Sequence, residues 1–153
     1  MLKRVELQHK VRLNGDEYDI LLSDESNFKS AFDTLNYILG EYTKNENTLI
    51  GFDTDDHLSV FKSGGHRNIY FYEDRQKLEP KRKEFVESVL EKHPTSRVHI
   101  IVCVPEENSL LFDVYRRCCD ITGNNEDLQS KTSVHSIVDY TLDEISTKIV
   151  IGA

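Results

Sequence analysis

Alternation of apolar and polar residues marks both ends of the chain. Residues 5–13 and 17–22 alternate on either side of Asn14-Gly15, a dipeptide that supplies the positive φ angles of a tight hairpin turn. The runs SVHSIVDYTL and TKIVIGA near the C-terminus are rich in β-branched residues, with a short turn or helical stretch between them. The pattern therefore predicts a strand or hairpin at the start of the chain and two strands at its end.

Three amphipathic helices are predicted where apolar residues recur at three- and four-residue spacing. Ser26 can cap the first helix, which ends near Gly40. Pro80 suits the first position of the second helix, which ends before His93-Pro94. Asn108 is a good N-cap for the third helix, whose apolar residues lie along one side. Each helix is expected to bury one face.

The segments between these helices predict further strands. TLIGF, LSVF and NIYFYE are divided by DTDDH and KSGGHR, two polar clusters of the kind that link antiparallel neighbours, so a three-stranded meander is predicted. VHIIVCV hardly alternates, which predicts a central strand that is covered by helices on both sides and lies next to NIYFYE. The polar segment GNNEDLQSKTS is interpreted as a loop or mobile segment.

The composition is that of one globular domain over residues 1–153. With 38% hydrophobic and 30% charged residues, and no apolar run near the roughly 18 residues of a membrane helix, a membrane protein is not expected. The first residues, MLKRVELQHKVRL, lack the continuous apolar segment of a secretory signal, so a cytoplasmic location is predicted. A net charge of −8 disfavours nucleic acid as a partner, because a phosphate backbone is bound mainly by Lys and Arg.

The cysteines and the acidic clusters indicate no metal centre. Cys103, Cys118 and Cys119 are odd in number and lie in apolar surroundings, which suits reduced, packed thiols without a structural disulfide. No CxxC or Cys/His spacing accompanies them, so no metal ligand is predicted. The cluster DTDDH at residues 53–57 could be a metal or acid/base site, but a polar hairpin tip explains it more simply.

The order of elements resembles the GNAT superfamily of acyl-CoA-dependent N-acetyltransferases. The sharpest local match is VPEEN, with Asn108 soon after the central strand and Tyr115 seven residues later on the next helix. The resemblance implies an α/β (α+β) fold with a mixed, mostly antiparallel sheet of about seven strands flanked by helices on both faces. In this family the sheet splits between its fourth and fifth strands to admit the acyl-CoA arm.

The same resemblance implies roles for two residues. Asn108 would help to hold the cofactor, and Tyr115 would be the catalytic general acid that protonates the departing CoA thiolate. The structural alternative is that Asn108 is only a helix cap and that Tyr115 packs its ring while its hydroxyl stays exposed.

One segment departs from the family pattern. Where the family has Q/R-x-x-G-x-G/A, this chain has KLEPKR, so Pro80 removes an N–H group and Arg82 replaces a glycine that lets pyrophosphate approach. The first turn of the following helix contains Lys81, Arg82 and Lys83, although the helix macrodipole disfavours cations there. A bound anion would relieve this conflict, so the three side chains would bind the cofactor in place of the missing loop. A solvated, charged helix end is the simpler alternative.

Two functions are expected from these observations. The favoured one is a GNAT-fold protein with a degraded CoA-binding loop that is non-catalytic and acts as a binding, regulatory or virion-associated protein, in the host cytoplasm or the virion if it is encoded by a phage. The alternative is an active acetyl-CoA-dependent N-acetyltransferase that modifies an amine of a protein or small molecule. Weak or absent acetyl-CoA binding and a protein partner are expected, and a homodimer is left open.

Overall fold

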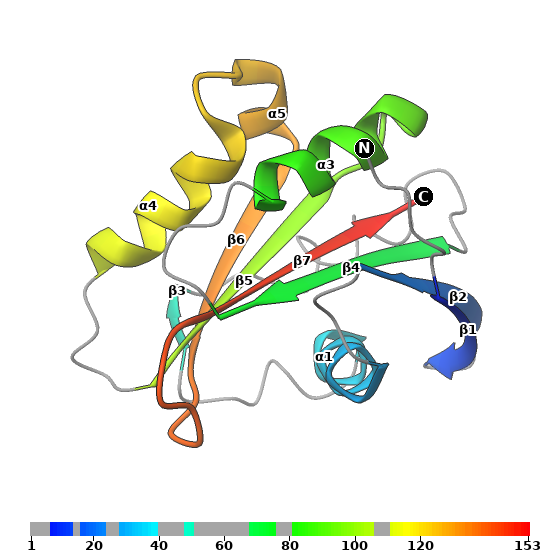
Figure 1. Ribbon diagram of the computed structural model, residues 1–153, viewed down its shortest axis with the longest axis horizontal. Coiled ribbons are helices and arrows are strands. Elements are labelled where there is room, and N and C mark those ends of the chain that lie inside the picture. The colour runs from blue at the N-terminus through cyan, green and yellow to red at the C-terminus, as the bar shows by residue number, and fades with distance from the viewer. Residues whose placement is uncertain are drawn as a thin grey trace.

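A mixed β-sheet runs through the middle of the molecule, with helices on both of its faces (Figure 1). The computed structural model describes residues 7–13, 16–23, 28–39, 48–50, 68–75, 81–105 and 111–153. In chain order, the elements in these ranges are β1 (Leu7–Leu13), β2 (Asp16–Leu22), α1 (Phe28–Leu39), β3 (Thr48–Ile50), β4 (Asn68–Asp74), α3 (Lys81–Lys92), β5 (Val98–Val104), α4 (Leu111–Thr122), α5 (Glu126–Ser130), β6 (Thr132–Val138) and β7 (Ser146–Gly152).

The seven described strands lie in the order β1-β2-β4-β7-β5-β6-β3. β2 pairs parallel with β4, and β5 pairs parallel with β6. β7 lies between the two parallel pairs and is antiparallel to both β4 and β5. The strands β2, β4, β5 and β6 therefore all end at one edge of the sheet, which is the edge where β7 begins.

Side chains alternate between the two faces of the sheet and form two separate apolar clusters. On β4, Ile69 and Phe71 pack on the side of α1, whereas Tyr70 and Tyr72 pack on the side of α3 and α4. All seven residues of β5 are buried, as predicted for a strand that is covered on both sides. Burial of each large aliphatic side chain contributes about 1.5–3 kcal/mol to the free energy of unfolding, so β5 anchors both clusters.

The predicted general class, a mixed α/β fold with helices beside a sheet, is confirmed. The N-terminal hairpin is also confirmed, because β1 and β2 pair antiparallel from Leu7 with Leu22 to Leu13 with Asp16. Helices occupy the three segments where apolar spacing predicted them. Among the described helices, none is long and apolar enough to span a membrane.

The predicted neighbours of two strands are wrong. β4 and β5 are not adjacent, since β7 is inserted between them and pairs with both. The predicted meander is not formed either, because β3 pairs with β6 at the far end of the sheet from β1, while the run LSVF lies outside the described residues. Local sequence could not reveal this, because pairing depends on which apolar strand competes best for the central position.

The polar segment after α4 also differs from its prediction as a loop. Gly123 ends α4 with a φ of 55°, a left-handed conformation that glycine adopts without strain. Asn125 then caps the short helix α5, since its side-chain oxygen accepts a hydrogen bond of 3.0 Å from the amide of Leu128. Leu128 is buried, so the signal that was missed is a capping asparagine followed by one apolar anchor.

Thiol reactivity tests the described burial of the central strand. Cys103 and Cys118 are buried and Cys119 is exposed, and burial raises the pKa of Cys103 and raises that of Cys118 to about 12. Because the thiolate is the reactive form, iodoacetamide at about pH 8 is expected to modify Cys119 first and the other two much more slowly. Peptide mass spectrometry over time, with urea-unfolded protein as the control, measures the three rates. Labelling of Cys103 as fast as that of Cys119 would contradict the buried position of β5.

Candidate functional site

The candidate site lies at the edge where the parallel strands end. Ligands of open α/β sheets bind outside the carboxyl ends of the strands, because the loops to helices on opposite faces separate there. In this protein α1 follows β2 on one face, while α3 and α4 follow β4 and β5 on the other (Figure 1). Polar residues gather at this edge, at the ends of β4 and β6 and the start of β7.

A cavity of about 780 Å³ opens at this edge, on the face that carries α1. Its walls are the first turns of α1 and residues 137–142 at the end of β6, and its floor is formed by β5, β7 and the end of β4. The volume lies within the range of about 300–1,000 Å³ that is typical of small-molecule sites. Apolar side chains on the floor and one wall are Ile101, Cys103, Ile137 and Leu142.

A lysine and a glutamate stand side by side on this floor. Lys148 on β7 is the direct cross-strand partner of Glu73 on β4, and Nζ of Lys148 lies 3.7 Å from Oε2 of Glu73. Their side chains are only 18% and 11% exposed. The hydroxyl of Ser30 on α1 donates a hydrogen bond of 2.8 Å to the same Glu73 oxygen. The residues that the structure describes make no hydrogen bond to the Lys148 ammonium group, which keeps its donors for another acceptor.

Ser146 lies two residues before Lys148 on the same face of β7. Ser146 is 1% exposed and lines the cavity. Its Oγ atom has no hydrogen-bond partner within the described part of the chain. A buried hydroxyl without a partner costs about 1–3 kcal/mol, so a polar atom placed in the cavity next to it would remove that cost. Ser146 and Lys148 together therefore offer donors on one side of the cavity.

Asp139, directly after β6, brings a negative charge to the same cavity. Partial burial alone would raise its pKa, but hydrogen bonds from the hydroxyl and amide of Thr141 and the charges of Lys148 and Arg75 outweigh burial, so the pKa is lowered. The hydroxyl of Thr141 lies 2.6 Å and its amide 3.0 Å from Oδ1 of Asp139. Both hydrogen bonds go to Oδ1, so Oδ2 of Asp139 is left for another donor.

The described part of the lining carries charges of both signs. Its described side chains include three acidic and three basic residues: Asp33, Glu73, Asp139, Lys29, Arg75 and Lys148. At the rim, Tyr140 is 59% exposed, the largest exposure of an apolar or aromatic side chain in the described segments. Among these segments, no group of three or more His, Cys, Asp and Glu side chains is placed to hold a metal ion.

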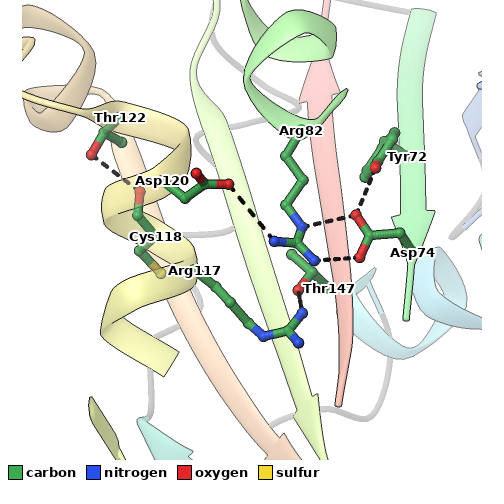
Figure 2. A network of polar contacts seen from close by, with 8 residues as sticks. All are labelled: Tyr72, Asp74, Arg82, Arg117, Cys118, Asp120, Thr122 and Thr147. Carbon is green, nitrogen blue, oxygen red and sulfur yellow. Dashed lines mark hydrogen bonds and ion pairs between the residues drawn. The ribbon is translucent and has the colours of Figure 1, made fainter. Parts of the chain in front are cut away.

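A buried ionic network lies on the other face of the same strands (Figure 2). Arg82 of α3 is fully buried and donates two hydrogen bonds to Asp74 of β4. Their lengths are 2.8 Å from Nε to Oδ2 and 2.5 Å from Nη2 to Oδ1. The hydroxyl of Tyr72 donates a further hydrogen bond of 2.6 Å to Oδ2 of Asp74. Nη1 of Arg82 also lies 3.8 Å from Oδ2 of Asp120 on α4. The network thus joins β4, α3 and α4.

A second arginine ties α4 to the first residues of β7. Arg117 is 3% exposed, and its Nη1 atom donates a hydrogen bond of 2.6 Å to Oγ1 of Thr147 (Figure 2). Thr147 is the cross-strand partner of Asp74, and it precedes Lys148, which faces the cavity. The network therefore fixes β4 and β7, the strands that carry Glu73 and Lys148, from the sheet face that packs against α3 and α4.

Of the residues that were predicted to bind a cofactor, the structure describes Lys81, Arg82 and Lys83, in the first turn of α3. Arg82 turns toward the sheet and into the network, whereas Lys81 and Lys83 are exposed, and Lys83 lies 3.8 Å from Glu87. Tyr115 lies in α4, but its side chain is outside the described residues, as is the whole of Asn108. The acidic cluster at residues 53–57 is also outside them. Predicted roles for these residues stay predictions without a structural test.

Sequence reasoning missed the residues of the cavity. The signal for Lys148 was a charged residue inside the apolar strand TKIVIG, and alternation places Ser146 and Lys148 on one face of it. The signal for Glu73 was its position at the end of NIYFYE. Neither signal shows that the two strands are neighbours, so the pair could not be predicted.

No protein-family model matches the chain, and no curated protein matches it. Solved structures that match include a point mutant of FtsZ from M. jannaschii, at 18% identity and a TM-score of 0.49, covering 85% of this chain and 42% of that one. An empty FtsZ dimer from M. jannaschii matches at 17% identity and a TM-score of 0.49, covering 85% of this chain and 41% of that one. The chain thus spans less than half of each structure, and likeness of this extent gives no indication of activity.

The predicted membership of the GNAT superfamily is wrong. In this protein β7 lies between β4 and β5 and pairs with both, at the place where the family's sheet splits. Both functions that depended on that resemblance, the degraded GNAT protein and the active N-acetyltransferase, are withdrawn with it. The expectation of weak or absent acetyl-CoA binding was not tested, and it loses the resemblance on which it rested.

The buried pair of Asp74 and Arg82 predicts a large effect on stability. Asp74→Asn leaves the guanidinium of Arg82 without its bidentate carboxylate, and loss of one partner of a buried pair costs about 3–5 kcal/mol. The double variant Asp74→Leu/Arg82→Met is expected to recover part of that loss, because neither member of the Asp74–Arg82 pair is left buried without the other, while Asp120, whose side chain is 33% exposed, keeps access to water. Urea unfolding followed by circular dichroism measures both, with Lys83→Met on the exposed side of α3 as a control expected within about 0.5 kcal/mol. An effect of Asp74→Asn as small as the control's would contradict the described network.

The lowered pKa of Asp139 predicts a pH-dependent contribution to stability. Because the folded state favours the charged carboxylate, this contribution is present above the unfolded pKa of about 3.9 and is lost as the pH falls through the lower, folded value. Asp139→Asn is therefore expected to be less stable than the wild type by up to about 1 kcal/mol near neutral pH, and equally stable in strong acid. Unfolding curves across this pH range test it, and a difference that persists unchanged into strong acid would contradict it.

Proposed function

We propose that the chain is a binding domain for a small polar molecule, held in the cavity between α1, β7 and residues 137–142. The observation that carries this proposal is the pair of unused donors on one face of β7. Lys148 has an ammonium group without a described hydrogen bond, and Ser146 has a buried hydroxyl without a described partner. Both line the same cavity.

The physical reason is the cost of placing these groups there. A lysine ammonium and a serine hydroxyl lose favourable hydration when they are buried, and the loss is offset only by new hydrogen bonds or ion pairs. One ion pair of 3.7 Å with Glu73 offsets part of that loss for Lys148. A bound polar molecule would supply the remaining acceptors.

The position of the cavity supports the same proposal. It lies at the carboxyl edge of β4, β5 and β6, where a ligand can contact several strands at once. The network of Asp74, Arg82 and Arg117 rigidifies β4 and β7 behind the cavity. A preorganised site loses less conformational entropy on binding, so this support favours affinity.

Binding rather than catalysis is proposed because neither the thiol nor the serine hydroxyl of the cavity is activated as a nucleophile by the described residues. Cys103 is the one cysteine in the lining, and burial raises its pKa, so little reactive thiolate forms at neutral pH. The hydroxyl of Ser146 has no described base beside it that would activate it as a nucleophile. The cavity is therefore better equipped to hold a ligand than to attack one.

The cellular setting follows from the thiols. Cys103, Cys118 and Cys119 are free, which suits a reducing compartment such as the cytoplasm, and we propose that location. A protein partner and a homodimer, both expected from the sequence, remain proposals that no described contact tests.

A fragment screen by NMR tests the proposed function. Small polar fragments added to the ¹⁵N-labelled chain are expected to shift the amide signals of Ile101, Ser146 and Lys148, which lie around the cavity. Signals of the remote helix α5 are the internal control and are expected to stay in place. A binding domain is contradicted if no fragment shifts the cavity signals, or if shifts gather elsewhere on the molecule.

A further inference from the structure

The charges of the cavity select among polar ligands. Lys148 and Arg75 would attract an anionic group, but Glu73 and Asp139 lie in the same lining and would repel it. Among the described lining residues, three acidic and three basic side chains leave no net positive charge to compensate the lost hydration of a phosphate dianion. A ligand that carries one charge of each sign meets a complementary group for both charges.

The two charges have separate places in the cavity. Lys148 and Ser146 follow the same face of β7, two residues apart, so one carboxylate can accept a hydrogen bond from the ammonium of the first and from the hydroxyl of the second. Asp139 lies directly after β6 in the same lining, where Oδ1 accepts both hydrogen bonds from Thr141 and Oδ2 is left for a donor. An ammonium group of the ligand would lie against that oxygen.

Apolar side chains make up part of the remaining lining, beside polar residues such as Ser30, Thr34 and Thr141. Ile101 and Ile137 belong to the floor and the β6 wall, and Leu142 lies on the turn that follows β6. Burial of an aliphatic group against such a surface is favourable by roughly 25 cal/mol per Å², so a hydrophobic side chain adds affinity there. The volume of about 780 Å³ exceeds what a single small amino acid fills, which leaves room for a second residue.

From this arrangement we propose that the ligand is a zwitterion with an aliphatic side chain, an apolar α-amino acid or a dipeptide of such residues. Its carboxylate is held by Lys148 and Ser146, its ammonium by Asp139, and its side chain by the apolar floor. This inference rests on the proposed function, because it names the class of molecule that the same cavity takes.

Calorimetric titration of the full chain with leucine and with leucyl-leucine tests the proposal. Leucinamide lacks the carboxylate and N-acetyl-leucine lacks the ammonium, so each removes one element of recognition. Glycerol phosphate, a dianion without an ammonium group or an aliphatic side chain, tests for an anion site instead. At least one of the two zwitterions is expected to bind, and all three analogues are expected to bind at least tenfold more weakly, because each loses a charge-assisted hydrogen bond.

Variants of the two donors locate the binding. Ser146→Ala and Lys148→Met are each expected to weaken the binding of the zwitterion at least tenfold. Ser130→Ala and Lys92→Met, at exposed positions on α5 and α3, are the matched controls and are expected to leave it unchanged. Because Lys148→Met removes the partner of Glu73, its thermal unfolding is recorded as well, and the milder Ser146→Ala variant carries the test if the first is unfolded.

Each outcome decides the proposal. Binding of leucinamide or N-acetyl-leucine as tight as that of the zwitterions would overturn it, as would tighter binding of glycerol phosphate or zwitterion binding that both donor variants leave unchanged. Absence of any zwitterion binding overturns it too, while the fragment screen decides independently whether the cavity binds small molecules at all. A failure of the zwitterion is thereby distinguished from a failure of the binding domain.

Discussion

Strand β7 is the element on which the rest of the structure depends, because it pairs antiparallel with β4 on one side and with β5 on the other. Without it, the two parallel pairs β2/β4 and β5/β6 would share no hydrogen bonds and the sheet would be divided. Its register also places side chains: Lys148 stands beside Glu73, and Thr147 beside Asp74. A shift of this register by one residue would turn Lys148 to the face of α3 and α4 and expose the opposite set of side chains, so burial on both faces holds the register in place.

The adjacent residues Glu73 and Asp74 show how one strand serves two environments. Alternation turns Glu73 to the cavity and Asp74 to the buried network. Asp74 has a bidentate guanidinium and a tyrosine hydroxyl, so its charge is matched within the protein. Lys148, which faces Glu73, retains donors that the described residues do not use. The face of α3 and α4 therefore supplies rigidity, and the face of α1 supplies a place where a ligand can complete the hydrogen bonding.

The cationic start of α3 illustrates why local sequence was misleading. Lys81, Arg82 and Lys83 suggested either an anion at the helix N-terminus or a solvated charged end. The structure gives a third explanation for Arg82, which is turned inward and neutralised by Asp74, while its two neighbours remain exposed. The ion pair with Asp74 of β4 offsets the unfavourable interaction of this guanidinium with the helix dipole. The partner comes from another element, so the charges within the helix could not reveal it.

The sequence by itself determined most of the local elements, with the short helix α5 as an exception. Alternation gave β1 and β2 as a hairpin around Asn14-Gly15, spacing gave the helices, and the unbroken apolar run VHIIVCV indicated a strand buried on both faces. These features depend on neighbours within a few residues, where the periods of helix and strand are read directly. Tertiary structure alone decided that β7 separates β4 from β5, that Glu73 meets Lys148 across 75 positions of chain, and that Arg82 finds Asp74. Strand order is a competition among apolar segments for central places, and its outcome depends on the packing of the whole core.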